Sequence, residues 1–184
     1  MAGATDNLVI VGRRPEPGRF AVKNLLILRH AKSAYPSDIS DDFERPLNKR
    51  GRGDLPRLAR LLERFGPRPD TILCSPARRA RETVQGLELA APIDYRESLY
   101  LATVEQLEET LATAAENCPT VLLVGHNPGL GEWLEELTGA HVQLPTAALA
   151  AVQLGRSTWA RHGDGPSYLQ WLVVPRMLRA YAQE

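Results

Sequence analysis

The sequence lacks the features of several large functional classes. Its 184 residues include only two cysteines, and 22 basic residues balance 22 acidic ones. A chain without net charge produces no long-range field that attracts nucleic acid or an anionic membrane, so we expect neither as a partner. Cys74 and Cys118 do not form a metal-ligand spacing. They indicate reduced thiols in a cytoplasmic protein, with a disulfide as the less favoured alternative.

Long hydrophobic runs are also missing. Residues 1–22 contain no apolar stretch long enough for a signal peptide or a membrane span, although Leu8 to Val11 could form a short edge strand. We expect residues 1–22 to be an N-terminal extension that is mobile or packs at the rim. Residues 23–184 are predicted to form a single domain, because 43% hydrophobic residues suffice for one core. No internal repeat or Walker motif is present.

Three apolar runs end in polar residues that can carry chemistry. They are Leu25 to Leu28 before Arg29-His30, Thr71 to Cys74 before Ser75-Pro76, and Thr120 to Val124 before Gly125-His126-Asn127-Pro128. Such runs are typical of parallel strands that are buried on both faces, and ligands of parallel sheets bind beyond the carboxyl ends of the strands. The sequence therefore predicts that Arg29, His30 and His126 meet at one edge of one sheet.

Helices are expected directly after the second and third runs. Ser75 and Asn127 are favourable N-cap residues, and Pro76 and Pro128 suit the first helical position. Arg79 then falls in the opening turn of the first helix. Two helix N-termini and fixed arginine charges at one place indicate an oxyanion site, most of all for a phosphoryl group.

The other elements complete an α/β protein. We expect a helix that starts at Asp54 and Pro56, with one apolar stripe of Leu55, Leu58, Leu62 and Phe65. A capping box of Thr103 and Gln106 starts another helix, Gly139 ends the helix after Pro128, and strands are expected at 148–152 and 169–174. The predicted fold is a three-layer α/β/α sandwich, with a mostly parallel sheet of about five to six strands and helices on both faces.

Four motifs together resemble a known family. They are Arg29-His30-Ala31-Lys32-Ser33, Arg45-Pro46-Leu47 with Arg50-Gly51, Ser75-Pro76 with Arg79-Ala80 and Thr83, and Gly125-His126-Asn127-Pro128. In this order they resemble the histidine phosphatase superfamily, the phosphoglycerate-mutase-like proteins, and within it the small phosphohistidine phosphatases of the SixA type. The resemblance spans roughly residues 24 to 178. It implies a phosphoglycerate-mutase-like fold and a phosphatase that forms a phosphohistidine intermediate.

The chemistry of phosphoryl transfer assigns roles to these residues. His30 is the expected nucleophile, because a neutral imidazole is nucleophilic and neighbouring arginines lower its pKa. Arg29, Arg79 and, if it is protonated, His126 would hold the phosphoryl oxygens and stabilise the charge of the transition state. Ser33 and Asn127 are candidates for phosphate contacts or for orienting other groups, with helix capping as the equal alternative for Asn127. We predict no metal and no cofactor, because the positive charges are built in.

Two further histidines are expected to lie at the surface. Arg161-His162-Gly163 spells the commonest signature of the family, but it lies in a stretch rich in Gly, Asp and Pro between two predicted strands. We therefore interpret His162 as a loop residue without a catalytic role. His141, before another turn that contains proline, is interpreted in the same way.

One position departs from the family pattern. Many relatives carry a carboxylate there that protonates the leaving oxygen, but here Leu101 of Leu99-Tyr100-Leu101 occupies that place. A phosphohistidine needs this proton less than an ester does, because the departing imidazole can be protonated beforehand. The departure favours cleavage of P–N bonds over P–O bonds. Glu97, or an acid in residues 38–44, could still supply the proton.

Three interpretations remain open at this stage. The first is a phosphohistidine phosphatase that acts on a phosphorylated protein, such as a phosphotransfer domain or a phosphocarrier. The second is a phosphomonoesterase for a small phosphorylated substrate, which a carboxylate on the leaving-group side of the phosphate would reveal. A non-catalytic phosphate-binding module is disfavoured, because all four core residues are present. The oligomeric state is unknown from sequence.

Overall fold

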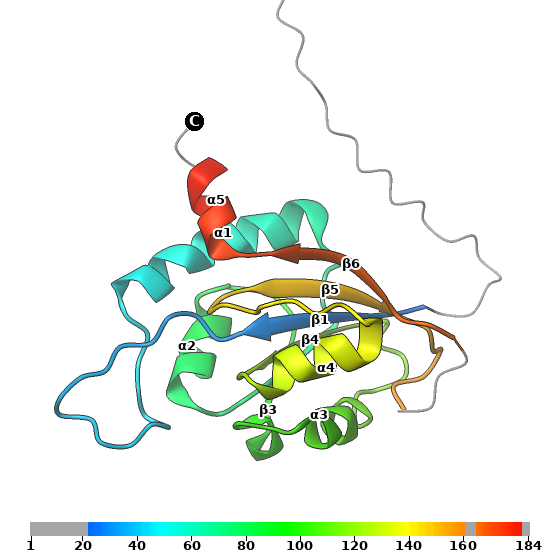
Figure 1. Ribbon diagram of the computed structural model, residues 1–184, viewed down its shortest axis with the longest axis horizontal. Coiled ribbons are helices and arrows are strands. Elements are labelled where there is room, and N and C mark those ends of the chain that lie inside the picture. Colours follow the sequence, from blue (N-terminus) through cyan, green and yellow to red (C-terminus); the bar gives the residue numbers. More distant parts are fainter. Residues whose placement is uncertain (1–21, 161–164, 182–184) are drawn as a thin grey trace, which may run out of the picture.

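A computed structural model describes residues 22–160 and 165–181 of the protein. Its centre is one six-stranded sheet with the strand order β3–β2–β4–β1–β5–β6 (Figure 1). The strands are β1 (Lys23–Arg29), β2 (Thr71–Cys74), β3 (Ile93–Tyr95), β4 (Thr120–Gly125), β5 (Leu149–Leu154) and β6 (Tyr168–Val173). The first four strands run parallel, and β5 and β6 are antiparallel to their neighbours. The predicted sheet, mostly parallel with five to six strands, is confirmed.

Helices cover both faces of this sheet. They are α1 (Lys49–Phe65), α2 (Arg78–Gln85), α3 (Val104–Leu111), α4 (Gly129–Thr138) and α5 (Pro175–Tyr181), with a short 3₁₀ helix η1 (Glu97–Leu99). The buried side chains of α1 and α2 share one apolar cluster, against which α5 also packs, and those of α3 and α4 share the other. Figure 1 shows α3 and α4 in front of the strands. The three-layer α/β/α sandwich is therefore as predicted.

Alternation along β1 divides the core between the two faces. Leu25 and Ile27 belong to the cluster of α3 and α4, while Leu26 and Leu28 belong to the cluster of α1 and α2. All four side chains are fully buried, which stabilises the fold by about 1.5–3 kcal/mol for each side chain. An unbroken apolar run is required because a central parallel strand has helices on both sides.

The start of α1 corrects the sequence prediction. The helix begins at Lys49 and not at Asp54, and Pro56 lies inside it with its ring exposed. Asn48 is the N-cap, because its side-chain oxygen accepts a hydrogen bond from the N–H of Gly51 at 2.8 Å. The apolar stripe is also shorter than predicted: the side chains of Leu55, Leu58 and Leu62 are buried, whereas Phe65 is exposed.

The starts of α2 and α4 give a second correction. Ala77 and Pro128 occupy the cap positions, neither makes a side-chain cap, and the prolines at 76 and 128 precede the helices. Ser75 and Asn127 are therefore not N-caps, and their side chains bind groups that belong to the site described below. By contrast, the capping box of Thr103 and Gln106 and the left-handed C-cap at Gly139 are confirmed.

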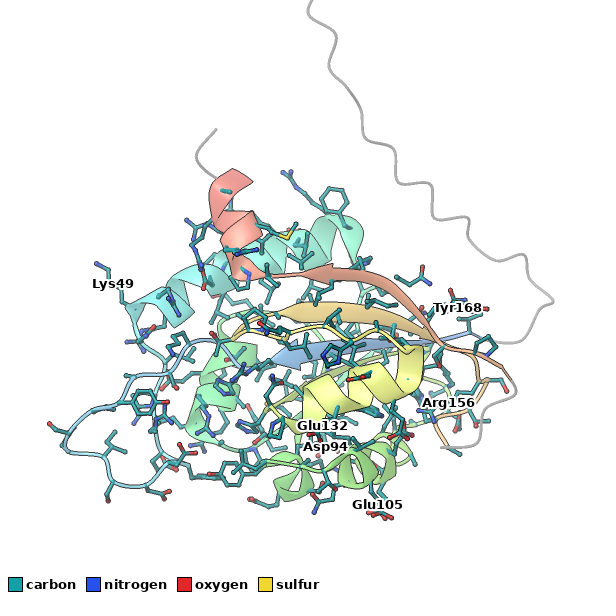
Figure 2. All side chains as sticks on the ribbon, in the orientation of Figure 1. Lys49, Asp94, Glu105, Glu132, Arg156 and Tyr168 are labelled. Atoms are coloured by element: carbon teal, nitrogen blue, oxygen red, sulfur yellow. The ribbon has the colours of Figure 1, made fainter. Side chains whose placement is uncertain are left out.

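The end of the sheet opposite the carboxyl ends of the parallel strands is held by a buried ion pair. Arg156 Nη1 lies 2.9 Å from Glu108 Oε2, and the indole N–H of Trp133 donates to Glu108 Oε1 at 2.6 Å. Figure 2 labels Arg156 at that end of the molecule. In the ranges 22–160 and 165–181, the helices are too short or too polar to cross a membrane.

Candidate active site

Three neighbouring strands end side by side and position polar residues at one edge of the sheet. β1 pairs with β4 so that Arg29 is opposite Gly125, and β4 also pairs with β2. The residues that follow the three strands are His30, His126 and Ser75, and all three are buried. The structure thus brings the two predicted site histidines together, with 5.0 Å between their ring centroids.

The hydrogen bonds of His30 define which ring nitrogen is free to react. Its Nδ1 lies 2.8 Å from the carbonyl oxygen of Ala31, so Nδ1 carries the hydrogen and donates it. Its Nε2 accepts a hydrogen bond from Nε of Arg79 at 3.3 Å and therefore carries a lone pair. Burial, reinforced by the charges of Arg79, Arg29 and Arg45, lowers the pKa of His30 to about 4, against a smaller opposing effect of the bond to Ala31. At neutral pH the ring is uncharged.

His126 faces the same space from the end of β4. Its Nε2 lies 2.9 Å from Ser75 Oγ, and its ring meets the edge of Tyr100, with 5.4 Å between the ring centroids. Burial, with further contributions from His30 and Arg79, lowers the pKa of His126 to about 3. A doubly protonated His126 is therefore disfavoured in the free protein, because a buried imidazole beside guanidinium groups keeps only one ring hydrogen at neutral pH.

Two arginines approach His30 from different elements. Arg79, in the first turn of α2, is almost fully buried, and its Nη2 lies 2.9 Å from Asp42 Oδ2. Arg45 lies in the segment before α1; its Nη1 is 2.6 Å from Asp42 Oδ1, and its Nη2 donates to Ser33 Oγ at 2.6 Å. The guanidinium carbon Cζ of Arg45 lies 3.4 Å from the centroid of the Tyr35 ring, so the two groups stack. Ser33 therefore orients Arg45, and among the described residues no side-chain hydrogen bond joins Ser33 to His30.

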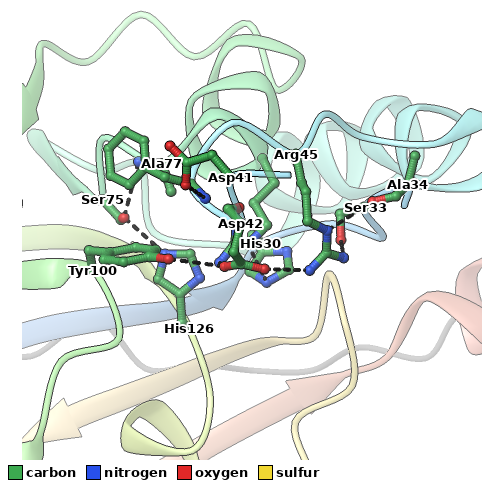
Figure 3. A network of polar contacts seen from close by, with 12 residues as sticks. His30, Ser33, Ala34, Asp41, Asp42, Arg45, Ser75, Ala77, Tyr100 and His126 are labelled. Carbon is green, nitrogen blue, oxygen red and sulfur yellow. Dashed lines mark hydrogen bonds and ion pairs between the residues drawn. The ribbon is translucent and has the colours of Figure 1, made fainter. Parts of the chain in front are cut away.

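Asp42 lies between Tyr100 and Arg45, close to the two histidines, as Figure 3 shows. Its side chain is half-exposed and joins Arg45, Arg79 and the hydroxyl of Tyr100, which donates to Oδ2 at 3.0 Å. Although partial burial opposes it, the hydrogen bonds from Arg45 and Tyr100 and the charge of Arg79 lower the pKa of Asp42. This carboxylate thus occupies guanidinium donors of the kind that bind phosphate.

Arg29 and Asn127 are tied to one backbone carbonyl. Arg29 Nη1 donates to the carbonyl oxygen of Leu144 at 2.7 Å, and Asn127 Nδ2 donates to the same oxygen at 3.1 Å. The Nε of Arg29 and the Oδ1 of Asn127 are buried and have no partner among the described residues. Arg29 therefore has a free N–H donor, and Asn127 a free oxygen acceptor, next to the two histidines.

Other candidates do not join this cluster. Leu101 has an exposed side chain and a left-handed backbone (φ 50°), and Glu97 in η1 is exposed without a bond to the site. His141 is a surface residue, as predicted: its side chain is 90% exposed and pairs with Glu135. His162 lies outside the described residues. No group of three or more His, Cys, Asp or Glu side chains suited to a metal occurs within the described ranges.

Sequence reasoning missed Tyr100 and Ser75 as members of the site, and it did not single out Asp42 from the other acids that could reach the site. Asp42 was one of several acids in residues 38–44, and no periodicity distinguishes it, because the segment forms neither helix nor strand. The sequence feature that could have pointed to Tyr100 was its position next to Leu101, which stands where many relatives carry a carboxylate. Arg45 was part of a family motif but had no role assigned.

The geometry can be compared with known proteins. The family model of the histidine phosphatase superfamily (branch 1) matches residues 25–120, which include Arg29, His30 and Arg79. The chain belongs to this superfamily. This histidine phosphatase is 34% identical over 160 residues to an uncharacterised protein of Mycobacterium tuberculosis, an alignment that covers 81% of this chain and 100% of the relative. An uncharacterised chloroplastic protein of Arabidopsis thaliana is 30% identical over 176 residues, with 86% and 81% covered.

Solved structures of histidine phosphatases share the fold. A candidate phosphohistidine phosphatase SixA from Agrobacterium tumefaciens has a TM-score of 0.70 and 29% identity, covering 83% of this chain and 99% of its own. The protein histidine phosphatase SixA complexed with tungstate has a TM-score of 0.70 and 26% identity, covering 84% and 99%. A mycobacterial glucosyl-3-phosphoglycerate phosphatase shares the fold alone, with a TM-score of 0.59 and 16% sequence identity. The match covers 81% of this chain and 97% of the other. The protein is thus a SixA-like phosphatase and a hydrolase.

Proposed function

We propose that this histidine phosphatase removes the phosphoryl group from phosphohistidine on a signalling or phosphocarrier protein in the cytoplasm. Support for the substrate class comes from the likeness to SixA structures above 25% identity and from the leucine at position 101. The cellular location is supported by the two free cysteines, Cys74 and Cys118.

His30 is the proposed nucleophile because its Nε2 lone pair faces the arginines. Nε2 attacks phosphorus in line as the P–N bond to the substrate imidazole breaks, and the imidazole leaves with a proton it has already taken up. Water then hydrolyses phosphorylated His30, which releases inorganic phosphate and restores the free ring. Arg29, Arg79 and His126 hold the phosphoryl oxygens, and each such donor contributes about 3–4 kcal/mol to transition-state stabilisation.

The observation that carries this proposal is the absence of a carboxylate at position 101. Tyr100 turns toward His126 and Asp42, while the next side chain, Leu101, points into solvent. An ester substrate would release an alkoxide, which needs an acid within hydrogen-bond reach. A protonated imidazole leaves without such an acid, so the site as built suits a phosphoramidate.

Asp42 favours a second candidate function, a small-molecule phosphomonoesterase. Its carboxylate pairs with both arginines beside His30, and a bound phosphate dianion would compete with it for Arg79 and Arg45. In the free protein its lowered pKa keeps it ionised, so it has no proton to give at neutral pH. Repulsion by the phosphate would raise that pKa and enable Asp42 to act as the acid for an ester.

A substrate comparison tests the two candidates. We expect a phosphohistidine-bearing phosphocarrier protein to be hydrolysed at least a hundredfold faster than an alkyl phosphate or p-nitrophenyl phosphate. Leu101→Glu should raise ester hydrolysis more than phosphohistidine hydrolysis, because a general acid contributes about 10²–10⁴-fold. Leu101→Gln is the matched control, with the same length and the same strain at a positive φ. Glu97→Gln should leave phosphohistidine hydrolysis unchanged.

The variant Asp42→Asn tests the second candidate function, the phosphomonoesterase. If ester hydrolysis in the wild-type protein equals phosphohistidine hydrolysis, and Asp42→Asn removes the ester activity alone, the phosphomonoesterase is the correct assignment. Asp41→Asn is the control, because Asp41 caps the same segment through the N–H of Phe43 and an asparagine oxygen keeps that bond. A loss of ester activity through Glu97→Gln would lead to the same conclusion, with Glu97 as the acid.

The charges of the site also predict its inhibitors. Tungstate and vanadate should compete with substrate, because the arginines that would hold a phosphoryl group also suit these oxyanions. Activity should survive treatment with a chelator. Inactivation by the chelator, reversed by a divalent cation, would contradict the proposed mechanism.

A further inference from the structure

The buried hydrogen bond between Ser75 and His126 has a direction that its neighbours determine. A serine hydroxyl has one hydrogen and two lone pairs. The N–H of Ala77 donates to Ser75 Oγ at 3.3 Å and takes one lone pair. Among the residues that the structure describes, His126 Nε2, at 2.9 Å, is the one acceptor for the hydroxyl hydrogen. Ser75 is fully buried, so water does not replace this acceptor.

The opposite direction would leave the buried hydroxyl hydrogen of Ser75 unsatisfied. If His126 Nε2 carried the hydrogen and donated it to Ser75, the serine hydrogen would have no acceptor, which costs about 1–3 kcal/mol in a buried place. With Ser75 as the donor, Nε2 is satisfied and the single hydrogen of the neutral ring resides on Nδ1. This Nδ1 is buried and has no partner in the described part of the chain.

The free nitrogen of His126 lies on the side of the reacting group. In Figure 3 the ring nitrogen that is not bonded to Ser75 faces His30 and Asp42. The short distance between the two imidazole rings agrees with this view. A buried N–H that lacks a partner beside a nucleophile indicates an acceptor supplied by a ligand.

We propose that Ser75 is a positioning residue that holds His126 as the neutral tautomer with its hydrogen on Nδ1, so that His126 donates a hydrogen bond to the transferring phosphoryl group. The inference rests on the proposed function for its catalytic consequence. It assigns Ser75 a task other than helix capping, and it removes the need for a protonated His126.

The charged groups around His126 make the tautomer important. Arg79 from α2 and Arg29 from β1 oppose a second proton, whereas Asp42 favours it, and the neighbouring rings are His30 and Tyr100. Burial and the arginines prevail, so the pKa of His126 is low and its ring is neutral. A neutral imidazole has one N–H, and it donates to phosphate only when that hydrogen is on the correct nitrogen.

Nuclear magnetic resonance of protein labelled with ¹⁵N at histidine tests the tautomer without any substrate. Long-range ¹H–¹⁵N correlations separate the two neutral forms, and His126→Gln assigns the signals by removing one set. At pH 7 we expect His126 of the wild-type protein to be the Nδ1–H form. Ser75→Ala should shift it toward the Nε2–H form. An Nε2–H form in the wild-type protein, or a spectrum unchanged by Ser75→Ala, would overturn the proposal even if the protein is an active phosphatase.

Kinetics then test the consequence of the tautomer. Ser75→Ala should lower kcat by about 10- to 100-fold, by analogy with residues that orient metal ligands through a hydrogen bond. It should also weaken tungstate binding. Ser75→Thr restores the hydroxyl and should recover the Nδ1–H signal and part of the rate. Thr110→Val is the control, because it removes a buried hydroxyl of α3 that bonds within that helix and to Ser98.

Two outcomes separate this inference from the proposed function. A full wild-type kcat in a folded Ser75→Ala protein whose tautomer has changed would overturn the catalytic part of the inference. If the wild-type spectrum is as expected but no phosphorylated substrate is turned over, the proposed function fails and the positioning by Ser75 stands. If Ser75→Ala does not fold, the tautomer of His126 in the wild-type and Ser75→Thr proteins still tests the inference. An Nε2–H form in the wild-type protein would overturn it.

Discussion

The ends of β1 and β4 place the two histidines of the site in similar surroundings but bind them by opposite ring nitrogens. His30 is held at Nδ1 by the carbonyl oxygen of Ala31, whereas His126 is held at Nε2 by the hydroxyl of Ser75. Both rings are buried, and both have a lowered pKa. The difference therefore lies in hydrogen-bond direction and not in electrostatics.

This difference gives each ring one task. A carbonyl oxygen only accepts, so it keeps a hydrogen on Nδ1 of His30 and leaves a lone pair at Nε2. A serine hydroxyl can donate, so it takes the lone pair of Nε2 in His126 and leaves a hydrogen at Nδ1. In the proposed mechanism, the two neutral imidazoles would thus serve as a nucleophile and a hydrogen-bond donor.

The largest effect is expected from His30→Ala. Removing the nucleophile should abolish turnover while the fold persists, because His30 follows β1 and its side chain lies at the open edge of the sheet. Acid-sensitive ³²P labelling should mark the wild-type protein at His30 and leave the variant unlabelled. Turnover at the wild-type rate in folded His30→Ala would disprove the mechanism.

Two other histidines, His141 and His162, are the matched controls for this change. His141→Ala removes an exposed imidazole and should leave both turnover and labelling unchanged. His162→Ala should also be nearly silent, since its Arg-His-Gly motif does not follow a buried strand in the sequence. An inactive His162→Ala protein would mean that the wrong Arg-His pair was assigned.

A smaller loss is expected from His126→Gln. Without its donor the transition state loses one hydrogen bond, which should lower kcat by about 10²–10³-fold. Phosphorylated His30 should still form, more slowly, in a rapid-quench experiment. A loss as complete as that of His30→Ala, with no phosphorylated protein, would break the comparison and give His126 a covalent task.

The elements that carry both histidines were predictable because hydrophobic runs mark buried parallel strands. Leu25 to Leu28 and Thr120 to Val124 lie within β1 and β4, and each ends next to a histidine as expected. Helix starts were predicted less well. Ser75 has the chemistry of a cap, but its hydroxyl turns to His126, and a sequence does not distinguish local from tertiary partners of a serine.

The covering residues of the site were not predictable. Asp42 and Arg45 belong to a segment without regular structure, and the contacts between Asp42 and Tyr100 join positions 58 residues apart. Residues in such segments have no periodicity that fixes where their side chains point. The protonation state of His126 was left open by the sequence, because its lowered pKa depends on burial and on guanidinium groups that only the folded chain assembles.

The two low pKa values predict a pH dependence of stability. Each imidazole has an ordinary pKa of about 6.5 in the unfolded chain, but about 4 for His30 and about 3 for His126 in the folded protein. Below pH 6.5 the unfolded state therefore binds more protons, and the unfolding free energy should fall toward pH 4 by up to about 1.4 kcal/mol per pH unit for each ring.

Urea unfolding of the wild-type protein at several pH values between 7.5 and 4.5 measures this slope. His126→Gln removes one of the two imidazoles and should make the dependence shallower, whereas His141→Ala is the control for a surface ring. If stability were constant or increased as the pH falls through this window, the rings would be protonated in the folded protein. The neutral forms assigned to His30 and His126 would then be excluded.

The smallest effect is expected from Thr83→Val, which loosens the support of His30 alone. Thr83 Oγ1 accepts a hydrogen bond from the N–H of Ala31 at 2.9 Å and donates to the carbonyl oxygen of Arg79 at 2.6 Å. Valine keeps the shape but leaves that buried N–H unpaired, which should lower the unfolding free energy by about 1–3 kcal/mol. The rate of phosphorylation of His30 should fall several-fold, because the peptide that orients its ring is less constrained. In the ¹⁵N spectrum His126 should keep the Nδ1–H form, since Ser75 is untouched. A change of the His126 tautomer in this variant would mean that the two histidines share one support, and the separation of tasks between the ends of β1 and β4 would be lost.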